Sequence, residues 1–371
     1  MVTPGLAAGA SAGWAGAAGA GWAGLVLLGF FFGAGVVAGV EEVVDCAHKG
    51  PAIRASVRAA ASALRGALKE ITRDLVAHFP ASVQSATMKR PRKLFCFGFG
   101  YTAAALAGAL RAEGWSVAGT CRDEAKRAAL EAQGIEAHLF ARDRPLDPKA
   151  FRGADAVLVS IPPDAEGDPV AALHGKDLDA GWLGYLSTTG VYGDRQGGWV
   201  DETSARDAIS ARGKRRVAAE DAWLALHKSH NVPAHLFRLA GIYGPGRSAI
   251  DTVRAGTARR IDKPGQVFSR IHVVDIVRTL RASIAKPAPG TAYNVADDCP
   301  APPQDVIEYA CELLGLEPPP LVPFDKAELS EMGRSFYAEC KRVRNERIKK
   351  ELGVTLACPD YKSGLKGLAA S

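Results

Sequence analysis

The chain has 371 residues, too many for one ordinary domain and enough for two. Hydrophobic residues make up 47% and charged residues 23%, so the chain can bury a full core, which excludes wholesale disorder and a fibrous repeat. The net charge of +6 forms no basic block suited to nucleic acid, and seven cysteines without a Cys-x-x-Cys pair indicate reduced thiols in the cytoplasm.

Residues 1–45 form an apolar, Gly- and Ala-rich segment. It has no charged residue before Glu41, and residues 22–40 match the roughly 20 residues that a membrane-spanning helix needs. We therefore expect an apolar N-terminal helix and a candidate transmembrane span. Lys and Arg follow this segment, so the rest of the chain would lie on the cytoplasmic side, anchored to the inner face of the membrane.

Residues 46–87 are predicted to form an amphipathic helix and a linker. Apolar residues recur in steps of three and four from Ile53 to Phe79, and Pro80 ends the pattern. Two interpretations of residues 1–87 stay open. Either they anchor the protein to a membrane, or they are an extension upstream of a start at Met88.

The most specific motif is a glycine turn between a short apolar strand at 93–97 and a helix that reaches about residue 113. Its Gly-x-Gly-x-x-Ala spacing predicts a dinucleotide site, because Gly98 permits a tight turn, Gly100 lets a pyrophosphate approach and Ala103 lets the helix pack closely. The alternative is a turn that only closes a βα unit. The expected cofactor-binding residues here are Gly98, Phe99, Gly100, Tyr101, Thr102 and Ala103.

Arg122 follows the next predicted strand, at 116–119. An acidic residue at this position would bind the ribose 2′-hydroxyl of NAD, whereas a guanidinium can pair with the 2′-phosphate of NADP. We therefore expect NADP as the preferred cofactor and NAD as the alternative. Asp123 comes next, and a register change of one residue would reverse this preference.

Further strands are predicted at 135–140, 156–161 and 182–187, alternating with helical segments. This alternation predicts an α/β fold of the Rossmann type, a doubly wound parallel sheet over residues 88–240. Ligands of such sheets bind at the carboxyl ends of the strands. The further cofactor-binding residues expected there are Ser160, Ile161, Pro162 and Ser187.

Four later segments resemble the extended short-chain dehydrogenase/reductases, the NAD(P)-dependent epimerase/dehydratase family. They are STTGVYGD at 187–194, FRLAGIYGPGR at 237–247, RIHVVDIV at 270–277 and YNVADD at 293–298, in the family's order. The sequence is most similar to an atypical bacterial subgroup that lacks the usual Tyr-x-x-x-Lys pair. The resemblance implies a smaller C-terminal substrate domain over residues 241–371 and a sugar substrate that is nucleotide-linked or phosphorylated, or a related carbonyl compound.

In the family, a Tyr and a Lys four residues later perform acid-base catalysis beside a Ser or Thr at a strand end. Thr188 matches the Ser or Thr, but Arg212 and Arg216 replace the pair, and a guanidinium cannot exchange protons near neutrality. Tyr192 and Tyr243 are candidate catalytic proton donors if a cation such as Arg216 lowers their pKa. Alternatively, both only pack against the ligands.

A second Tyr-x-x-x-Lys pattern occurs near the C-terminus, at Tyr337 and Lys341. We interpret it as chance spacing, because it lies far along the chain from the other motifs.

The resemblance places Arg247, Arg270 and His272 at substrate-binding positions, and guanidinium groups suit phosphate. Surface ion pairing is the alternative for the arginines, and a structural role in the core is the alternative for His272. No metal site is expected, because the histidines at 227, 230 and 235 lack carboxylate or cysteine companions. Helices are predicted at 303–314 and 326–352.

The primary hypothesis is an NADP-binding oxidoreductase or epimerase with a small-molecule substrate, as a monomer or homodimer. Loss of both members of the acid-base pair motivates a second hypothesis, a redox-silent NADP(H)-binding sensor or scaffold. In a third hypothesis, the main role belongs to the N-terminal segment, which anchors the protein to a membrane and brings the domain to lipid-linked sugars.

Overall fold

The structure is a computed structural model that describes residues 90–370, except for the side chain of Met332. The apolar helix expected at 22–40 and the amphipathic helix expected from Ile53 to Phe79 lie outside the described residues. Within residues 90–370, no helix combines the length and apolarity that a membrane span requires. The six cysteines of this part are all free thiols.

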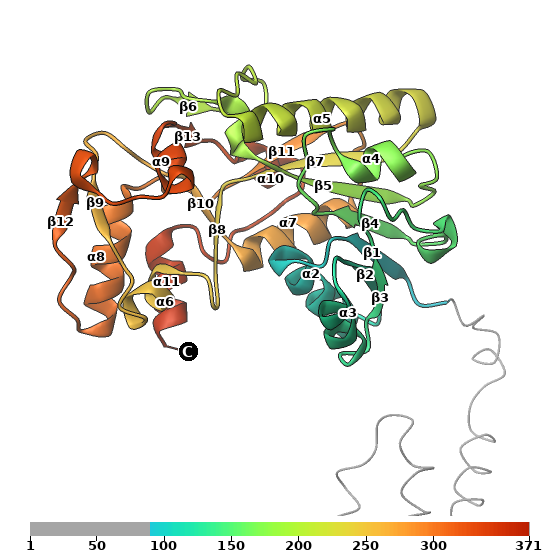
Figure 1. Ribbon diagram of the computed structural model, residues 1–371, viewed down its shortest axis with the longest axis horizontal. Helices are drawn as coiled ribbons and strands as arrows, with labels where there is room; N and C mark the ends of the chain where they lie inside the picture. The colour runs from blue at the N-terminus through green and yellow to red at the C-terminus, as the bar shows by residue number, and fades with distance from the viewer. Residues whose placement is uncertain (1–89, 371) are drawn as a thin grey trace, which may run out of the picture. The chain divides into compact units, whose positions relative to one another are not determined.

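A sheet of seven parallel strands forms the centre of this unit, in the order β11-β7-β5-β4-β1-β2-β3 (Figure 1). The order reverses between β1 and β4, which is the doubly wound arrangement, so the predicted α/β fold is confirmed. The strands are β1 Lys93–Phe97, β2 Ser116–Cys121, β3 Glu136–Leu139, β4 Ala156–Val159, β5 Trp182–Thr188, β7 Ala234–Leu239 and β11 Ala292–Val295.

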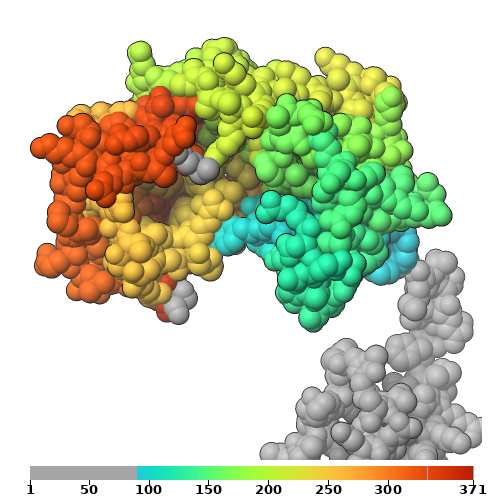
Figure 2. Space-filling model, in the orientation of Figure 1, coloured from blue at the N-terminus to red at the C-terminus, as the bar shows by residue number. Residues whose placement is uncertain are grey.

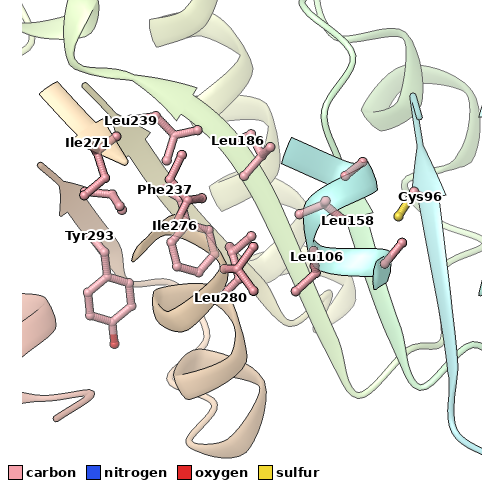
Figure 3. Close-up of a cluster of buried hydrophobic side chains, with 14 of the residues drawn as sticks. Cys96, Leu106, Leu158, Leu186, Phe237, Leu239, Ile271, Ile276, Leu280 and Tyr293 are labelled. Carbon is pink, nitrogen blue, oxygen red and sulfur yellow. The ribbon is translucent and has the colours of Figure 1, made fainter. Parts of the chain in front are cut away.

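Helices cover both faces of the sheet, so β4 and β7 are buried along their whole length rather than at alternate residues. On one face, Leu106 of α2 and Ile276 and Leu280 of α7 pack toward Leu158 and Leu186 of the sheet (Figure 3). The other face packs against α4 and α5. The helices are α2 Tyr101–Ala112, α3 Glu124–Glu131, α4 Pro169–His174, α5 Ala211–His230 and α7 Val273–Ala285.

A smaller region carries α6 Ala249–Arg254, α8 Pro303–Leu314 and α11 Tyr361–Ala369, which pack around a core of their own. Pairs of short parallel strands accompany it: β8 Gly241–Tyr243 with β10 Arg270–His272, β9 Arg260–Asp262 with β12 Leu321–Pro323, and β6 Trp199–Val200 with β13 Arg342–Val343. The remaining helices are α9 Glu331–Tyr337, α10 Glu346–Lys350 and the 3₁₀ turns Pro148–Ala150, Thr189–Tyr192 and Phe324–Lys326.

One predicted helix is wrong. Residues 326–352 form α9, β13 and α10 instead of one long helix. The backbone N–H of Cys340 donates to the carboxylate of Asp194, and that of Arg342 donates to the carbonyl of Gly198. These tertiary hydrogen bonds take the place of helical ones.

The single boundary expected between residues 240 and 241 is too simple. Strand β11 and helix α7 both come from the part of the chain that follows this boundary, yet β11 pairs with β7 at the edge of the main sheet and α7 covers one face. The chain therefore passes from the sheet to the smaller region and back.

Candidate functional site

The glycine turn after β1 needs a glycine at its first position. Gly98 has φ +86°, and a Cβ there would lie 2.8 Å from Cγ1 of Ile161. Its N–H donates to Oγ1 of Thr120 at 2.8 Å, and the Ser160 hydroxyl donates to its carbonyl oxygen at 2.6 Å. The turn is therefore fixed by both neighbouring strand ends.

The second glycine opens the turn to a ligand. Gly100 is the N-cap of α2, it offers no side chain to the first amides of the helix, and a Cβ placed there would meet no protein atom within 4 Å. Such amides and the partial positive charge of a helix N-terminus attract phosphate. Ala103 is fully buried where α2 packs on the sheet. These residues fit the pyrophosphate of a dinucleotide cofactor.

A cavity of ≈ 1080 Å³ lies beside this turn. Its walls come from the first turn of α2, the carboxyl end of β5, the start of α5, strands β8 and β10, and residues 331–343. Figure 2 shows the surface hollowed between the C-terminal segments, in orange, and the yellow and green middle of the chain. The cavity brings together these predicted site residues: Gly100, Tyr101, Thr102, Ser160, Ser187, Thr188, Arg216, Tyr243, Arg247 and Arg270.

The remaining predicted residues lie elsewhere. Phe99 and Ala103 are buried under the turn, Gly98 and Ile161 shape it, and Pro162 is exposed. Three others also lie outside the cavity wall: Arg122, Tyr192 and His272.

Thr188 ends β5 at the cavity wall. Its Oγ1 accepts a hydrogen bond of 3.1 Å from the N–H of Gly190. A hydroxyl that accepts in this way keeps its own hydrogen for donation, so Thr188 can hydrogen-bond an oxygen atom of a ligand.

Arg212 and Arg216 stand where the resemblance expects Tyr and Lys. Their guanidinium groups stay protonated near neutral pH, so they do not act as proton donors or acceptors in catalysis. Arg216 donates to the carbonyl oxygen of Leu186 and, at 3.2 Å, to the hydroxyl of Tyr185, so it is tied to β5. Arg212 is exposed and lies 5.2 Å from the ring centre of Phe336. Both line the cavity and make it more positive.

Tyr192 does not reach the cavity, which corrects its assignment as a proton donor. Its side chain is fully buried, and its hydroxyl donates to Oδ1 of Asn294 at 2.6 Å while accepting from Nη1 of Arg238 at 2.8 Å. Burial raises the pKa of Tyr192. The cation beside it is Arg238 and not Arg216.

Tyr243 lines the cavity, but its hydroxyl points to another partner, the carbonyl oxygen of Asp360 at 3.3 Å. Burial and the charge of Asp297 raise the pKa of Tyr243, opposite to the lowering that the sequence-based hypothesis required. His272 packs edge-on against this ring, and its Nδ1 accepts from the N–H of Val274 at the start of α7. His272 thus has the structural role that was the alternative.

The sequence analysis missed the contribution of residues 331–343. Tyr337 and Lys341 both line the cavity, although α9 ends at Tyr337 and the two are not on one helix. Nζ of Lys341 donates to the carbonyl oxygen of Gly193 at 2.7 Å and to Oε2 of Glu339 at 2.6 Å. The Tyr-x-x-x-Lys pattern was visible in the sequence, but only the fold brings it to the site.

Positive charge dominates the cavity wall, where Arg270 is a half-buried cation. Its Nη1 donates to the carbonyl oxygens of Phe268 at 2.9 Å and Ala301 at 3.0 Å, and no carboxylate among residues 90–370 forms an ion pair with it. Burial lowers the pKa of Arg270. The charged side chains on the wall are Arg212, Arg216, Arg247, Arg270, Lys341, Glu331 and Glu339.

Comparisons with known proteins identify a relative by sequence and solved structures with a similar fold. No family model matches the sequence. Over 288 residues the chain is 30% identical to Protein YeeZ of Escherichia coli strain K12, covering 72% of this chain and 97% of that protein. A functionally unknown conserved protein from Silicibacter pomeroyi DSS has a similar structure, with a TM-score of 0.69 and 52% identity over 75% of this chain and 98% of that chain.

A UDP-glucuronic acid 4-epimerase from Bacillus cereus, solved in complex with NAD, is similar with a TM-score of 0.61. It is 16% identical over 75% of this chain and 96% of that chain. At this identity the similarity concerns the fold, the Rossmann-type α/β fold of NAD-dependent epimerases.

Proposed function

The chain belongs to the family of Protein YeeZ of Escherichia coli, and we propose that it is an NAD(P)-dependent oxidoreductase or epimerase with an anionic substrate. One observation carries the proposal. The uncapped start of α2 at Gly100 opens into a cavity whose wall also bears Thr188 and several basic side chains. A site for a dinucleotide and a site for a phosphate-bearing substrate are thus adjacent.

The bound nicotinamide supplies a carbon that donates or accepts a hydride. The first amides of α2 would hold the pyrophosphate, and Ser187 and Thr188 at the end of β5 would line the part of the cavity that takes the nicotinamide. Thr188 donates its hydroxyl hydrogen to the reacting oxygen of the substrate. Holding both partners in this way supplies a large part of the rate enhancement.

The residues after β2 favour NADP over NAD. Oδ1 of Asp123, the acidic residue that follows, accepts from the N–H of Lys126 at 2.8 Å and caps α3, which gives this residue a structural role. Arg122 is exposed, and Nη2 of Arg144 donates to its carbonyl oxygen at 3.4 Å. Two guanidinium groups in the same loop region suit a 2′-phosphate.

Arg247 and Arg270 favour a nucleotide-linked or phosphorylated sugar, or a related carbonyl compound. A half-buried guanidinium without a counter-charge is costly, and an anion from the substrate would compensate it. Arg270 is such a group, and Arg247 lines the same cavity. The UDP-glucuronic acid epimerase with the same fold suggests nucleotide sugars as the first compounds to test.

Isothermal titration calorimetry of the full chain with NADPH and NADH tests the cofactor proposal. Arg122→Ala is expected to weaken NADPH binding by about 1.5–3 kcal/mol, as for hydrogen bonds to charged groups, and to leave NADH binding unchanged. Arg111→Ala, at the far end of α2, is the matched control and changes neither affinity. Failure of the wild-type chain to bind either dinucleotide would refute the proposal.

A redox-silent NADP(H)-binding sensor is the second candidate function. Arg212 and Arg216 favour it, because α5 brings no proton carrier to the cavity. The two functions are separated by following NADPH oxidation and NADP⁺ reduction over a panel of nucleotide sugars and phosphorylated carbonyl compounds. Binding without turnover of any compound favours the sensor.

A further inference from the structure

Three tyrosines line the cavity, and their hydroxyl groups differ in what they contact. Tyr101 donates to the carbonyl oxygen of Pro245 at 3.0 Å, and Tyr243 donates to that of Asp360 at 3.3 Å. The Tyr337 hydroxyl forms no hydrogen bond with any other described residue. Tyr337 is therefore the cavity tyrosine with both its hydrogen and its lone pairs available to a ligand.

The ring of Tyr337 is held in place. Tyr337 is 9% exposed. Its ring packs edge-on against Phe268, with ring centres 5.4 Å apart, and in a tilted arrangement against Phe324, with ring centres 5.1 Å apart. Its carbonyl oxygen accepts a hydrogen bond from Nζ of Lys263. A phenol fixed on two sides loses little freedom when it meets a ligand, which proton transfer in an active site requires.

The segment that carries Tyr337 is tied to the end of β5. Lys341 donates to the carbonyl oxygen of Gly193, and the N–H of Cys340 donates to Oδ1 of Asp194 at 2.7 Å. Both acceptors belong to the loop that follows Thr188. These two contacts hold the segment after Tyr337 against the loop after Thr188, and both residues line the same cavity.

Charge near Tyr337 favours its use as an acid. The Arg270 guanidinium donates to the carbonyl oxygen of Phe268, whose ring packs on Tyr337, and its charge acts on the Tyr337 phenol. It has no ion pair among the described residues, so it can stabilise the phenolate that proton donation leaves. Burial raises the pKa of Tyr337, although the charge of Arg270 opposes this, so the phenol keeps its proton at neutral pH. The other charged side chains on neighbouring segments are Lys263, Arg334, Glu339 and Lys341.

We propose that Tyr337 is the catalytic acid of this protein, supplied by α9 in place of the tyrosine that α5 lacks. The inference rests on the proposed function. Tyr337 gives its proton to the carbonyl oxygen of the substrate while the carbonyl carbon accepts a hydride from the reduced nicotinamide. The π pair of the C=O bond moves to oxygen and forms the new O–H bond, leaving an alcohol, the oxidised nicotinamide and a Tyr337 phenolate that takes a proton from water.

Titration of the phenol tests this placement without turnover. The ultraviolet absorbance of tyrosinate is followed against pH in the wild-type chain and in Tyr337→Phe, and their difference reports Tyr337. Bound NADP⁺ carries a positive nicotinamide ring, so the pKa of Tyr337 is expected to fall by about one to three pH units, whereas neutral reduced nicotinamide leaves it unchanged. In the control Tyr309→Phe, on α8, the difference signal does not respond to NADP⁺.

Two outcomes separate the proposed function from the inference. If the wild-type chain binds neither dinucleotide, the proposed function and the inference both fall. If NADP⁺ binds and the Tyr337 titration does not move, only the inference falls. Where circular dichroism shows a folding defect in Tyr337→Phe, Tyr101→Phe and Tyr243→Phe remove the other two cavity tyrosines in turn, and an NADP⁺-dependent shift that persists in both variants reports Tyr337.

Turnover gives the second readout. For a carbonyl compound that the wild-type chain reduces in the panel above, Tyr337→Phe is expected to lower kcat by about 10²–10⁴-fold, the usual range for a general acid, while NADPH affinity stays the same. An unchanged kcat contradicts the inference. So does a panel without any turnover, which leaves the sensor as the function.

Discussion

Glu220 on α5 and Arg238 on β7 form a buried ion pair of 2.8 Å next to the strand that leads to the site. The carboxylate is fully buried and the guanidinium side chain is 5% exposed. Oε1 of Glu220 also accepts the hydroxyl of Ser187 at 2.6 Å. Because Ser187 precedes Thr188, this ion pair fixes the end of β5 from the core side.

Glu220→Gln is expected to lower the free energy of unfolding by about 3–5 kcal/mol, because it leaves the Arg238 charge buried without its counter-charge. Urea unfolding measures the loss. Asp221→Asn is the matched control. Asp221 forms an ion pair of its own, with Arg206 at 2.7 Å, but its side chain is 56% exposed. Exposed ion pairs contribute less than about 1 kcal/mol. Equal losses in the two variants would contradict the structure.

Substitutions at the two glycines of the turn are expected to have different effects, one on the stability of the chain and the other on cofactor binding. Gly98→Ala places a Cβ 2.8 Å from Cγ1 of Ile161 at a φ of +86°, so the free energy of unfolding should fall; strain of this kind costs about 1–3 kcal/mol. Gly100→Asp meets no protein atom and caps α2, which changes stability by only a few tenths of a kcal/mol.

The carboxylate of Gly100→Asp competes with the pyrophosphate for the first amides of α2. NADPH affinity, measured by calorimetry, is expected to fall by about 100-fold, or ~2.7 kcal/mol. A folded variant that binds NADPH as tightly as the wild type would show that the turn does not hold the cofactor, whereas a variant that unfolds would contradict the open helix start at Gly100.

Asp297 makes stability depend on pH. Its side chain is 1% exposed, Oδ1 accepts from the N–H of Cys299 at 3.2 Å, and Oδ2 is buried without a partner among residues 90–370. Burial raises the pKa of Asp297 to about 8 from its ordinary 3.8. The folded chain therefore keeps this proton over a pH range in which the unfolded chain has lost it.

A raised pKa contributes stability below the unfolded value, and the contribution is lost as pH rises toward the folded value. From about pH 5 to about pH 8, the free energy of unfolding of the wild type should therefore fall by ~1–3 kcal/mol relative to that of Asp297→Asn. Urea unfolding at both pH values measures it, with Asp143→Asn, at an exposed carboxylate on another part of the chain, as control. A difference that does not vary with pH would exclude an uncharged Asp297.

The sequence predicted the features that neighbouring residues decide. Gly98 and Gly100 could be recognised because a positive φ and an open helix start leave a fixed spacing of glycines. Thr188 was identified by its match to a family motif, and the structure places it at the end of β5. The prediction that Tyr192 is a proton donor was wrong. Tyr192 lies near Thr188 in the chain, but its hydroxyl is bound by Asn294, 102 residues away.

The sequence by itself determined the doubly wound sheet, the dinucleotide turn and the absence of a proton carrier on α5, because backbone conformation, periodic burial and residue chemistry act over a few neighbouring positions. Only the tertiary structure decided that Tyr337 reaches the cavity while Tyr192 is buried. That outcome depends on contacts between distant segments, such as Lys341 with Gly193 across 148 residues, which no local pattern encodes.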